Sequence, residues 1–320
     1  MSVKITTGTP AVAAWLDGMV RSLANHSDRL DAINIFPVAD GDTGSNLYMT
    51  ARTAADAVSV LDTDDLGELL AAAGRAGMES ARGNSGTLLA VFLLGFSEPL
   101  RGHSRLTGRL LAAGLESGRV RAWSALSDPV PGTMLSVIAA AGDAAADAVG
   151  RSAAEPSSRA AVVEVLQAVS VAVLGAVVST EEQLGALRTA RIVDAGAVGM
   201  MLVLDELRAS VLGEPLDDAR YAPLHGYGIQ DPHVYVGREA EAGVEVMCTI
   251  ALEPLEAATL RAKLDALGDS VIMSAAGEAG DAYRWRVHVH VPEPDEALAA
   301  LHGAGEPVNI TVTDLCTHDG

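Results

Sequence analysis

The chain has 320 residues, of which 49% are hydrophobic, so it is long enough to build a sizeable core in one large domain or two smaller ones. Its 42 acidic residues outnumber its 22 basic ones and give a formal net charge of −20 at pH 7. A surface this negative repels nucleic acids and anionic lipids, so we expect neither class as a partner.

The first 213 residues are expected to be almost wholly helical, because their apolar residues recur at intervals of three and four. Proline and glycine interrupt this pattern at Pro37, Gly83, Pro99 and Gly150. The sequence predicts eight helices in an all-α domain, which we interpret as an antiparallel barrel. They lie near residues 9–26, 43–61, 64–81, 85–97, 104–126, 133–149, 157–179 and 196–212.

Residues 214–243 are rich in proline, glycine, tyrosine and charge, and are predicted to form a linker. From Val244 onward the apolar period changes to two, which is typical of strands. The order βαββαβ predicts a smaller α+β domain of the ferredoxin-like type over residues 244–320. Its expected elements are strand 244–252, helix 254–267, strand 269–275, strand 282–291, helix 294–303 and strand 307–313.

Three features concern the compartment. The two cysteines do not make a disulfide framework, and the first residues lack the apolar segment of a signal peptide. Apolar runs such as residues 87–96 are too short to cross a bilayer. We therefore expect a cytoplasmic protein with no integral membrane segment.

A turn with two carboxylates precedes the second predicted helix. Asp40 and Asp42 flank Gly41, and the helix begins directly afterwards with Thr43-Gly44-Ser45-Asn46. Carboxylates suit Mg²⁺, which fills its other positions with phosphate oxygens and water, and a helix N-terminus attracts phosphate. The alternative is a capped turn with two solvated acids.

Three further polar turns, each with a glycine, also introduce helices: Ala81–Gly86, Pro131–Met134 and Arg191–Gly196. Alternate loops of an antiparallel array share one end, so all four turns are predicted to meet at one rim. This convergence favours a nucleotide site over four independent helix caps. The sequence has no P-loop motif and no lysine near these turns, so metal ions, helix N-termini and Arg82 or Arg191 would have to balance the phosphate charge.

A second candidate site lies in the α+β domain. Cys248 is central in the first predicted strand, and His288 and His290 alternate along the third. The first and third strands are neighbours in a ferredoxin-like sheet, so one thiolate and two imidazoles could bind Zn²⁺. The alternative is a buried thiol beside two ordinary strand histidines.

The motifs together resemble a kinase family. NIFPVADGDTGSN is similar to the FPVPDGDTGTN signature shared by fatty acid kinases and the ADP-binding subunit of dihydroxyacetone (glycerone) kinase, the DhaL domain. ARGNSG, PGTM and VDAG follow in the family's order, and the Cys, GDS and VHVH segments resemble the middle domain of fatty acid kinase. Two positions and one motif depart from the pattern: Ala39 for proline, Ser45 for threonine, and VDAGAVGM where the family has VDSGGKG.

The resemblance implies an eight-helix barrel that binds ATP or ADP with two Mg²⁺ ions. It implies that Asp40 and Asp42 are catalytic metal ligands, with Asn34 as a weaker third ligand. It also implies zinc at Cys248, His288 and His290. The residues that it implies for nucleotide contact are Thr43, Gly44, Ser45, Asn46, Asn84, Ser85, Gly86, Thr133 and Asp194.

We therefore expect an ATP-dependent kinase that phosphorylates an acyl carboxylate presented by a fatty-acid-binding protein of the DegV-like type. A homodimer is compatible with the sequence. The family carries a further C-terminal domain, whereas this chain stops at Gly320, which we interpret as its absence. The alternatives are phosphorylation of dihydroxyacetone and a non-catalytic nucleotide-binding regulator.

Overall fold

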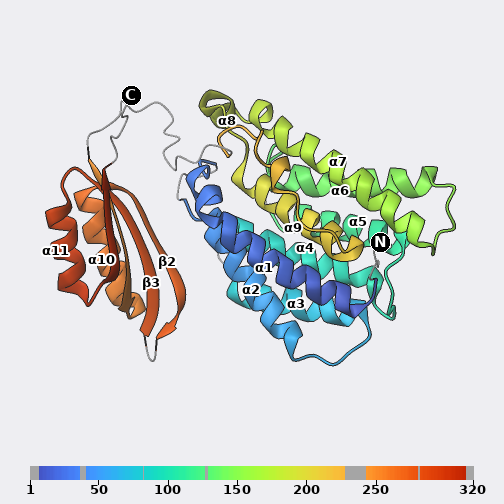
Figure 1. The fold of residues 1–320 in the computed structure, drawn as a ribbon, viewed down its shortest axis with the longest axis horizontal. Coiled ribbons are helices and arrows are strands. Elements are labelled where there is room, and N and C mark those ends of the chain that lie inside the picture. The colour runs from blue at the N-terminus through green and yellow to red at the C-terminus, as the bar shows by residue number, and fades with distance from the viewer. Residues whose placement is uncertain are drawn as a thin grey trace. The chain divides into compact units, whose positions relative to one another are not determined.

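The computed structural model describes the backbone of residues 7–36, 41–81, 83–126, 129–227, 243–279 and 282–314. The chain divides into two compact units, a helical unit and an α/β unit that follows it in the sequence (Figure 1). The protein is therefore mostly helical with one small sheet, which confirms the predicted fold class at this level.

The helical unit contains all eight helices expected from the sequence and one short helix that was not. The first helix continues six residues beyond its predicted end, and the fifth begins four residues late. The α-helices are α1 Thr9–Ala32, α2 Thr43–Ser59, α3 Leu66–Ser80, α4 Gly83–Ser97, α5 Gly108–Ser124, α6 Met134–Arg151, α7 Arg159–Gln183, the short α8 Gly185–Ala190 and α9 Ala195–Leu212.

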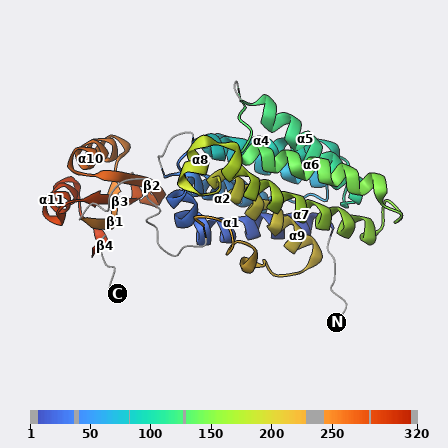
Figure 2. The ribbon, with the colours of Figure 1, turned by 90° about the horizontal axis from the view of Figure 1, so that it is seen from above.

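Helix α9 lies beside α7 and α1 in the helical unit (Figure 2). It packs against α1, α2, α6 and α7, and most of its side chains are buried. Its sequence is apolar on all sides, which is typical of a helix surrounded by others. Only two acids interrupt its buried surface, Asp205 and Glu206, and both have hydrogen-bond partners in neighbouring elements.

Close packing of α4 on α5 depends on glycine. A Cβ on Gly95 would lie 2.6 Å from the backbone oxygen of Ser117, whereas a Cβ on Gly175 in α7 would meet nothing within 4 Å.

We expect Gly175→Ala to stabilise the protein by about 0.5–1 kcal/mol, because alanine restricts the unfolded chain more and favours helix. Gly95→Ala should instead destabilise it by about 1–3 kcal/mol through overpacking. Urea unfolding of both variants measures the two changes. Equal effects would contradict this assignment of the two glycines.

Among the described residues, α7 is long and apolar enough to cross a membrane by length and composition. This is weak evidence, because core helices of soluble proteins meet the same criterion. One side of α7 is indeed buried in the core through Val165, Val169, Val173 and Val177.

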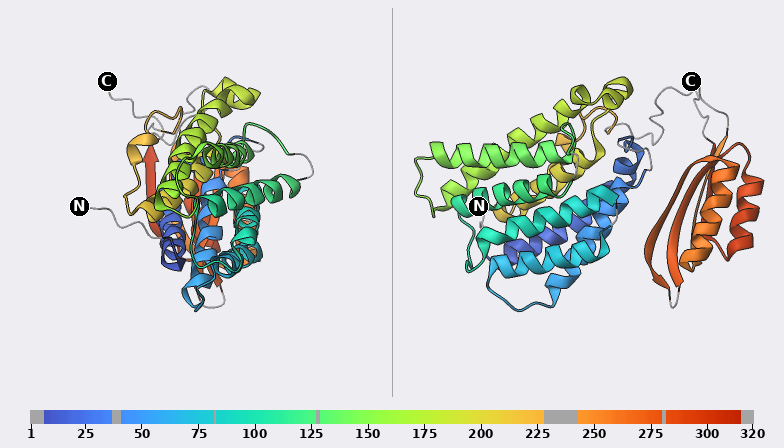
Figure 3. Two further views of the ribbon diagram at one scale, coloured as in Figure 1. Left: turned by 90° about the vertical axis from the view of Figure 1, so that its right-hand side faces the viewer. Right: turned by 180° about the vertical axis from the view of Figure 1, so that it is seen from behind.

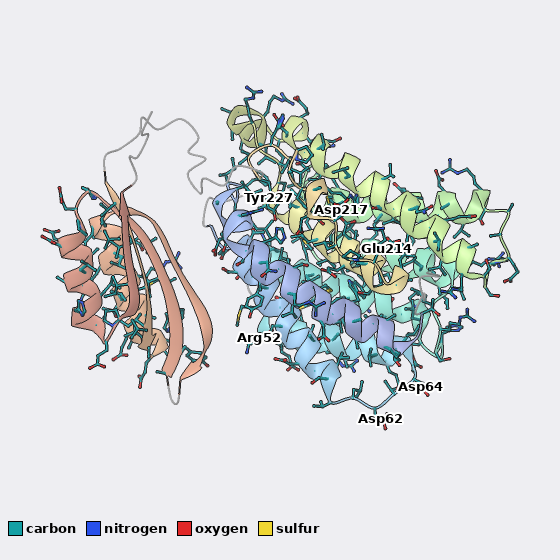
Figure 4. All side chains as sticks on the ribbon, in the orientation of Figure 1. Arg52, Asp62, Asp64, Glu214, Asp217 and Tyr227 are labelled. Atoms are coloured by element: carbon teal, nitrogen blue, oxygen red, sulfur yellow. The ribbon has the colours of Figure 1, made fainter. Side chains whose placement is uncertain are left out.

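Residues 214–227, here called the strap, follow α9 and contain the 3-10 helix η2 Asp218–Arg220 (Figure 4). The sequence predicted a linker for this segment, but it packs against the helical unit. Tyr221, Leu224 and Tyr227 are almost fully buried. The carbonyl oxygen of His225 accepts a hydrogen bond from Val193, immediately before α9 begins. The strap therefore returns to the end at which α9 starts.

His26 of α1 holds the last residue of the strap. Its Nδ1 lies 2.5 Å from the Tyr227 hydroxyl, and the two rings stack at 5.9 Å. Burial lowers the pKa of His26 from 6.5, while the facing Asp218 raises that pKa and Arg29 lowers it. Tyr221 also packs against the imidazole.

This lowered pKa predicts a pH dependence of stability. Since the folded state favours neutral His26, its contribution is fully present above about pH 6.5 and is lost as the pH falls below that value. We expect the wild type to lose more unfolding free energy between pH 7.5 and pH 5 than His26→Asn, which does not titrate. Urea unfolding at both pH values measures this, and equal losses would exclude the assignment.

The α/β unit has the element order β1 Val244–Leu252, α10 Pro254–Leu267, β2 Asp269–Ala279, β3 Ala282–Val291, α11 Pro294–Ala304 and β4 Val308–Asp314. Its four strands lie in the order β2-β3-β1-β4, and each neighbouring pair is antiparallel. Both helices lie on the same face of the sheet (Figure 3). The core between the layers includes Val246, Ile250 and Leu260.

The strand register contradicts the zinc site expected at Cys248, His288 and His290. Cys248 is buried among the core residues beneath the helices, and it pairs with Val287, which is also in that core. Positions 288 and 290 alternate with the buried valines of β3, and they pair with positions 247 and 245 of β1. Successive residues of a strand belong to opposite faces. Cys248 therefore does not share a face with His288 and His290, contrary to our expectation, and we do not propose zinc there.

Candidate functional site at the rim of the helical unit

Helices α2, α4, α6 and α9 begin at one end of the helical unit, here called the rim. A Cβ on Gly86 of α4 would lie 3.3 Å from the carbonyl oxygen of Asn46 in α2. A Cβ on Gly196 of α9 would lie 3.3 Å from Cβ of Met134, the first residue of α6. Helix α2 also contacts α9. The structure thus brings together the four helix starts that the sequence motifs introduce.

The two-carboxylate turn leads into α2 at the rim. Gly41 has φ of 60°, a left-handed conformation that favours glycine, and Asp42 is partly buried directly before the helix. Asn34, beyond the end of α1, is only 5% exposed. Asp40 lies outside the described residues, as does Arg82. Asp42 and Asn34 offer carboxylate and amide oxygens, which are the ligands that Mg²⁺ accepts.

Asp31, in the last turn of α1, caps the N-terminus of α2. Its Oδ1 accepts hydrogen bonds from the backbone N–H groups of Gly44 at 2.6 Å and Ser45 at 3.2 Å, and its Oδ2 accepts one from the Ser45 hydroxyl at 2.7 Å. Burial raises the pKa of Asp31 to about 7, and these bonds oppose the rise. The N–H groups of Gly44 and Ser45, which the sequence assigned to the nucleotide, therefore already have a protein acceptor.

Sequence reasoning missed Asp31. Asp31 and Gly44, whose N–H group it accepts from, are 13 residues apart in the sequence, and nothing in the local pattern links them. One signal was present: an acidic side chain in the last turn of a helix is unfavourable beside the negative end of the helix dipole, so it calls for another partner.

Asp194 caps two other helix starts at once. It is 5% exposed, its Oδ1 accepts a hydrogen bond from Ala197 of α9 at 2.7 Å, and its carboxylate also accepts one from Met134 of α6. Burial raises the pKa of Asp194 to about 7 against these bonds. Thr133 adds a weaker cap, because its hydroxyl oxygen accepts from Leu135 at 3.4 Å. Both side chains thus serve the helix starts themselves.

Helix α4 differs from the other three. It begins at Gly83, so Asn84 and Ser85 lie within its first turn. Among the described residues no side chain accepts a hydrogen bond from this turn. Asn84 is exposed, while Ser85 and Gly86 are buried against α2. Within the described part of the chain, the first turn of α4 can therefore offer backbone donors to an anion.

Asn46 supplies an unsatisfied donor at the same place. It is 6% exposed, and its side-chain Nδ2 has no hydrogen-bond partner among the described residues. Buried amide groups are nearly always paired, so this one calls for an acceptor. Its backbone oxygen lies beside Gly86, as described above. An oxygen-rich anion held with Mg²⁺ therefore fits the groups present at the rim.

Two other features are less informative. Arg191 precedes the Asp194 loop in a left-handed conformation with φ of 57°, and its side chain is exposed, so it can reach solvent at the rim. A hollow between α6 and α7, lined by Asp147, Arg151, Glu164 and Val171 among others, lies on the flank of the unit and includes none of the rim residues.

Comparison with protein-family models gives two matches. Residues 37–209 match the DAK2 domain, and residues 241–319 match the FakA-like middle domain of fatty acid kinases. The chain belongs to the fatty acid kinase and dihydroxyacetone kinase family. The resemblance read from the motifs is therefore confirmed.

Curated relatives extend over almost the whole chain. YloV of Bacillus subtilis is 28% identical over 325 aligned residues, which cover 98% of this chain and 56% of YloV. The uncharacterised Staphylococcus aureus protein SAB1090 is 26% identical, with 92% of this chain and 53% of that protein covered. The chain thus spans about half the length of these relatives.

Among solved structures, the dihydroxyacetone kinase of C. freundii in complex with AMP-PNP and Mg²⁺ is 22% identical, with a TM-score of 0.47. The match covers 65% of this chain and 35% of the kinase. A native form of the same kinase matches with a TM-score of 0.42.

Proposed function

We propose that this protein is an ATP-dependent kinase that transfers the γ-phosphoryl group of ATP to the carboxylate of an acyl chain held by a fatty-acid-binding protein. The observation that carries the proposal is the buried Nδ2 of Asn46, which has no hydrogen-bond partner among the described residues, in a residue that lies beside the first turn of α4 at the rim. Membership of the kinase family supports it.

The residues have distinct roles in this proposal. Asp40 and Asp42, with Asn34 as third ligand, hold two Mg²⁺ ions, which when bound neutralise the charge on the phosphates. The backbone of the turn Asn84–Gly86 and the amide of Asn46 donate to phosphate oxygens. Thr43 borders the nucleotide. The rim around it is shaped by Gly44 and Ser45, whose N–H groups Asp31 caps, and by the caps Thr133 and Asp194.

No general base is needed for this reaction. The acceptor carboxylate is already ionised near neutral pH, so it can attack the γ-phosphorus without losing a proton. The protein has to position the two reactants and balance charge, which are the main requirements of phosphoryl transfer.

The finer architecture belongs to the same proposal. We assign the helical unit to an eight-helix antiparallel barrel, with α8 as an addition between its last two members. We assign the α/β unit to the ferredoxin-like fold, and its strand order β2-β3-β1-β4 with antiparallel neighbours supports that assignment.

An acceptor assay tests the function. The purified protein is incubated with Mg-ATP and a fatty acid bound to a DegV-like binding protein, and hydroxylamine traps the acyl phosphate. We expect acyl hydroxamate to form only with all components present. Phosphorylation of dihydroxyacetone instead would favour the alternative kinase activity, and ATP binding without transfer to either acceptor would favour a regulator.

Several expectations stay predictions: cytoplasmic location, the DegV-like partner and a homodimer, and the lack of a nucleic-acid partner. Size-exclusion chromatography with light scattering tests the homodimer directly.

A further inference from the structure

One residue is bonded to both sides of the proposed metal loop. The backbone oxygen of Asp31 accepts a hydrogen bond from the N–H of Asn34 at 3.2 Å, where the loop leaves α1. Its carboxylate holds Gly44 and Ser45, where the loop enters α2, through the three bonds described above. The described ligands of the proposal lie at these two contacts: Asn34 at the first, and Asp42 two residues before Gly44 at the second.

We propose that Asp31 is a positioning residue that fixes the two described ends of this loop and so sets where the ligands Asn34 and Asp42 lie. The inference rests on the proposed function. A loop whose ends are fixed has less conformational entropy to lose when its ligands converge on a cation. Asp31 acts through the protein, because both of its carboxylate oxygens already accept hydrogen bonds from protein donors.

The same contact also determines where phosphate can bind. A carboxylate at the start of α2 uses the N–H groups of Gly44 and Ser45 and places a negative charge there. The start of α4 has no such side chain among the described residues. Asp31 thus directs an anion to the first turn of α4 and keeps the start of α2 for the metal loop.

Asp65 provides a matched control. It caps α3 by accepting hydrogen bonds from Gly67 at 2.8 Å, Glu68 at 3.1 Å and, across a loop, Gly102 at 2.6 Å. Like Asp31, it satisfies three donors and ties a loop to a helix start. It lies where α3 begins, away from the rim, so its loss should affect stability alone.

The test measures the affinity of Asp31→Ala, Asp31→Asn and Asp65→Ala for Mn²⁺ and for Mg-ATP by calorimetry, with thermal unfolding of each variant. Loss of an outer partner of a metal ligand typically costs 10–100-fold in affinity. We expect a loss of roughly that size for Asp31→Ala. We expect a smaller loss for Asp31→Asn, which keeps an acceptor oxygen, and none for Asp65→Ala.

Each outcome decides something. If Asp31→Ala and Asp65→Ala lower the melting temperature but leave both affinities unchanged, Asp31 is an ordinary helix cap and the inference fails. If Asp31→Ala does not fold, the affinity of Asp31→Asn is measured in its place. Wild-type affinity in Asp31→Asn would then overturn the inference. If Asp42→Ala binds Mg-ATP like the wild type, the proposed function itself fails, whatever Asp31 does.

Discussion

Replacing Asp42 by alanine is expected to lower the affinity for Mg-ATP by at least about 100-fold, which corresponds to about 2.7 kcal/mol. The reason is that Mg²⁺ is held by very few carboxylates, and each makes a large share of its protein contacts. Asp42 lies in a turn before α2 and is only partly buried, so its removal leaves the core of the unit intact. Calorimetric titration with Mg-ATP measures the loss, and circular dichroism shows that the fold is retained. Asp40→Ala should behave in the same way.

Asp62→Ala is the control for this experiment. Asp62 lies in the connection from α2 to α3, at the other end of the helical unit from Tyr227 (Figure 4). Its replacement changes the net charge by the same amount without touching the rim, so the affinity should stay at the wild-type value. An equal loss in both variants would attribute the effect to overall charge, and wild-type affinity in Asp42→Ala would refute the metal loop.

The helices of the first unit could be predicted because their signal is local. Apolar residues at intervals of three and four, such as those of α7, fix both the type of element and the side that is buried. Helix α8 was missed because its six residues are too few to show a period. The late start of α5 has a different cause: Thr107 caps it through its hydroxyl, and Ser104, three residues earlier, could also have capped a helix.

The caps at the rim could not be predicted to the same degree. Asp31 and Asp194 were both visible as acids near a helix start or end. Which backbone N–H groups each of them meets depends on how helices far apart in the sequence pack, as when Asp194 reaches the start of α6. The motifs therefore indicated where a site lies, while tertiary packing decided which backbone N–H groups the carboxylates of Asp31 and Asp194 occupy.

The face on which Cys248 lies was readable from the sequence. Cys248 is in phase with the buried residues Val246 and Ile250, whereas the two histidines are out of phase with Val287 and Val289. Applying the period of two to both strands separates the thiol from the imidazoles. The expectation of zinc was based on the first and third strands being neighbours. It did not take into account that successive residues of each strand lie on opposite faces of the sheet.

The strap shows why a polar, proline-rich segment is not always a linker. Asp205 lies beside Glu206 in the otherwise apolar buried surface of α9 and is 2% exposed, which requires a partner from another element. Arg220 and Tyr221 of the strap supply it, with Nη1 at 2.5 Å and the phenol oxygen at 2.8 Å. Burial and the neighbouring carboxylate raise the pKa of Tyr221, so its hydroxyl stays protonated and donates.

Asp205→Ala is therefore expected to destabilise the helical unit by about 3–5 kcal/mol, because it leaves Arg220 without its counter-charge in a mostly buried position. The strap should detach first, since Asp205 anchors it through both Arg220 and Tyr221. Urea unfolding measures the loss of stability. Hydrogen exchange should show faster exchange over residues 214–227 than over α2 or α4.

The exposed ion pair Asp147–Arg151 is a control that shows whether the effect of Asp205→Ala comes from burial of the pair or from charge alone. These side chains are 72% and 77% exposed and lie 3.5 Å apart, so Asp147→Ala should change stability by less than about 0.5 kcal/mol. In a double-mutant cycle, Asp205→Ala and Arg220→Ala should cost clearly less together than the sum of their separate effects, because removing both leaves no unpaired charge. Additive effects, or a loss at Asp147 as large as that at Asp205, would show that the strap is not held by this buried pair.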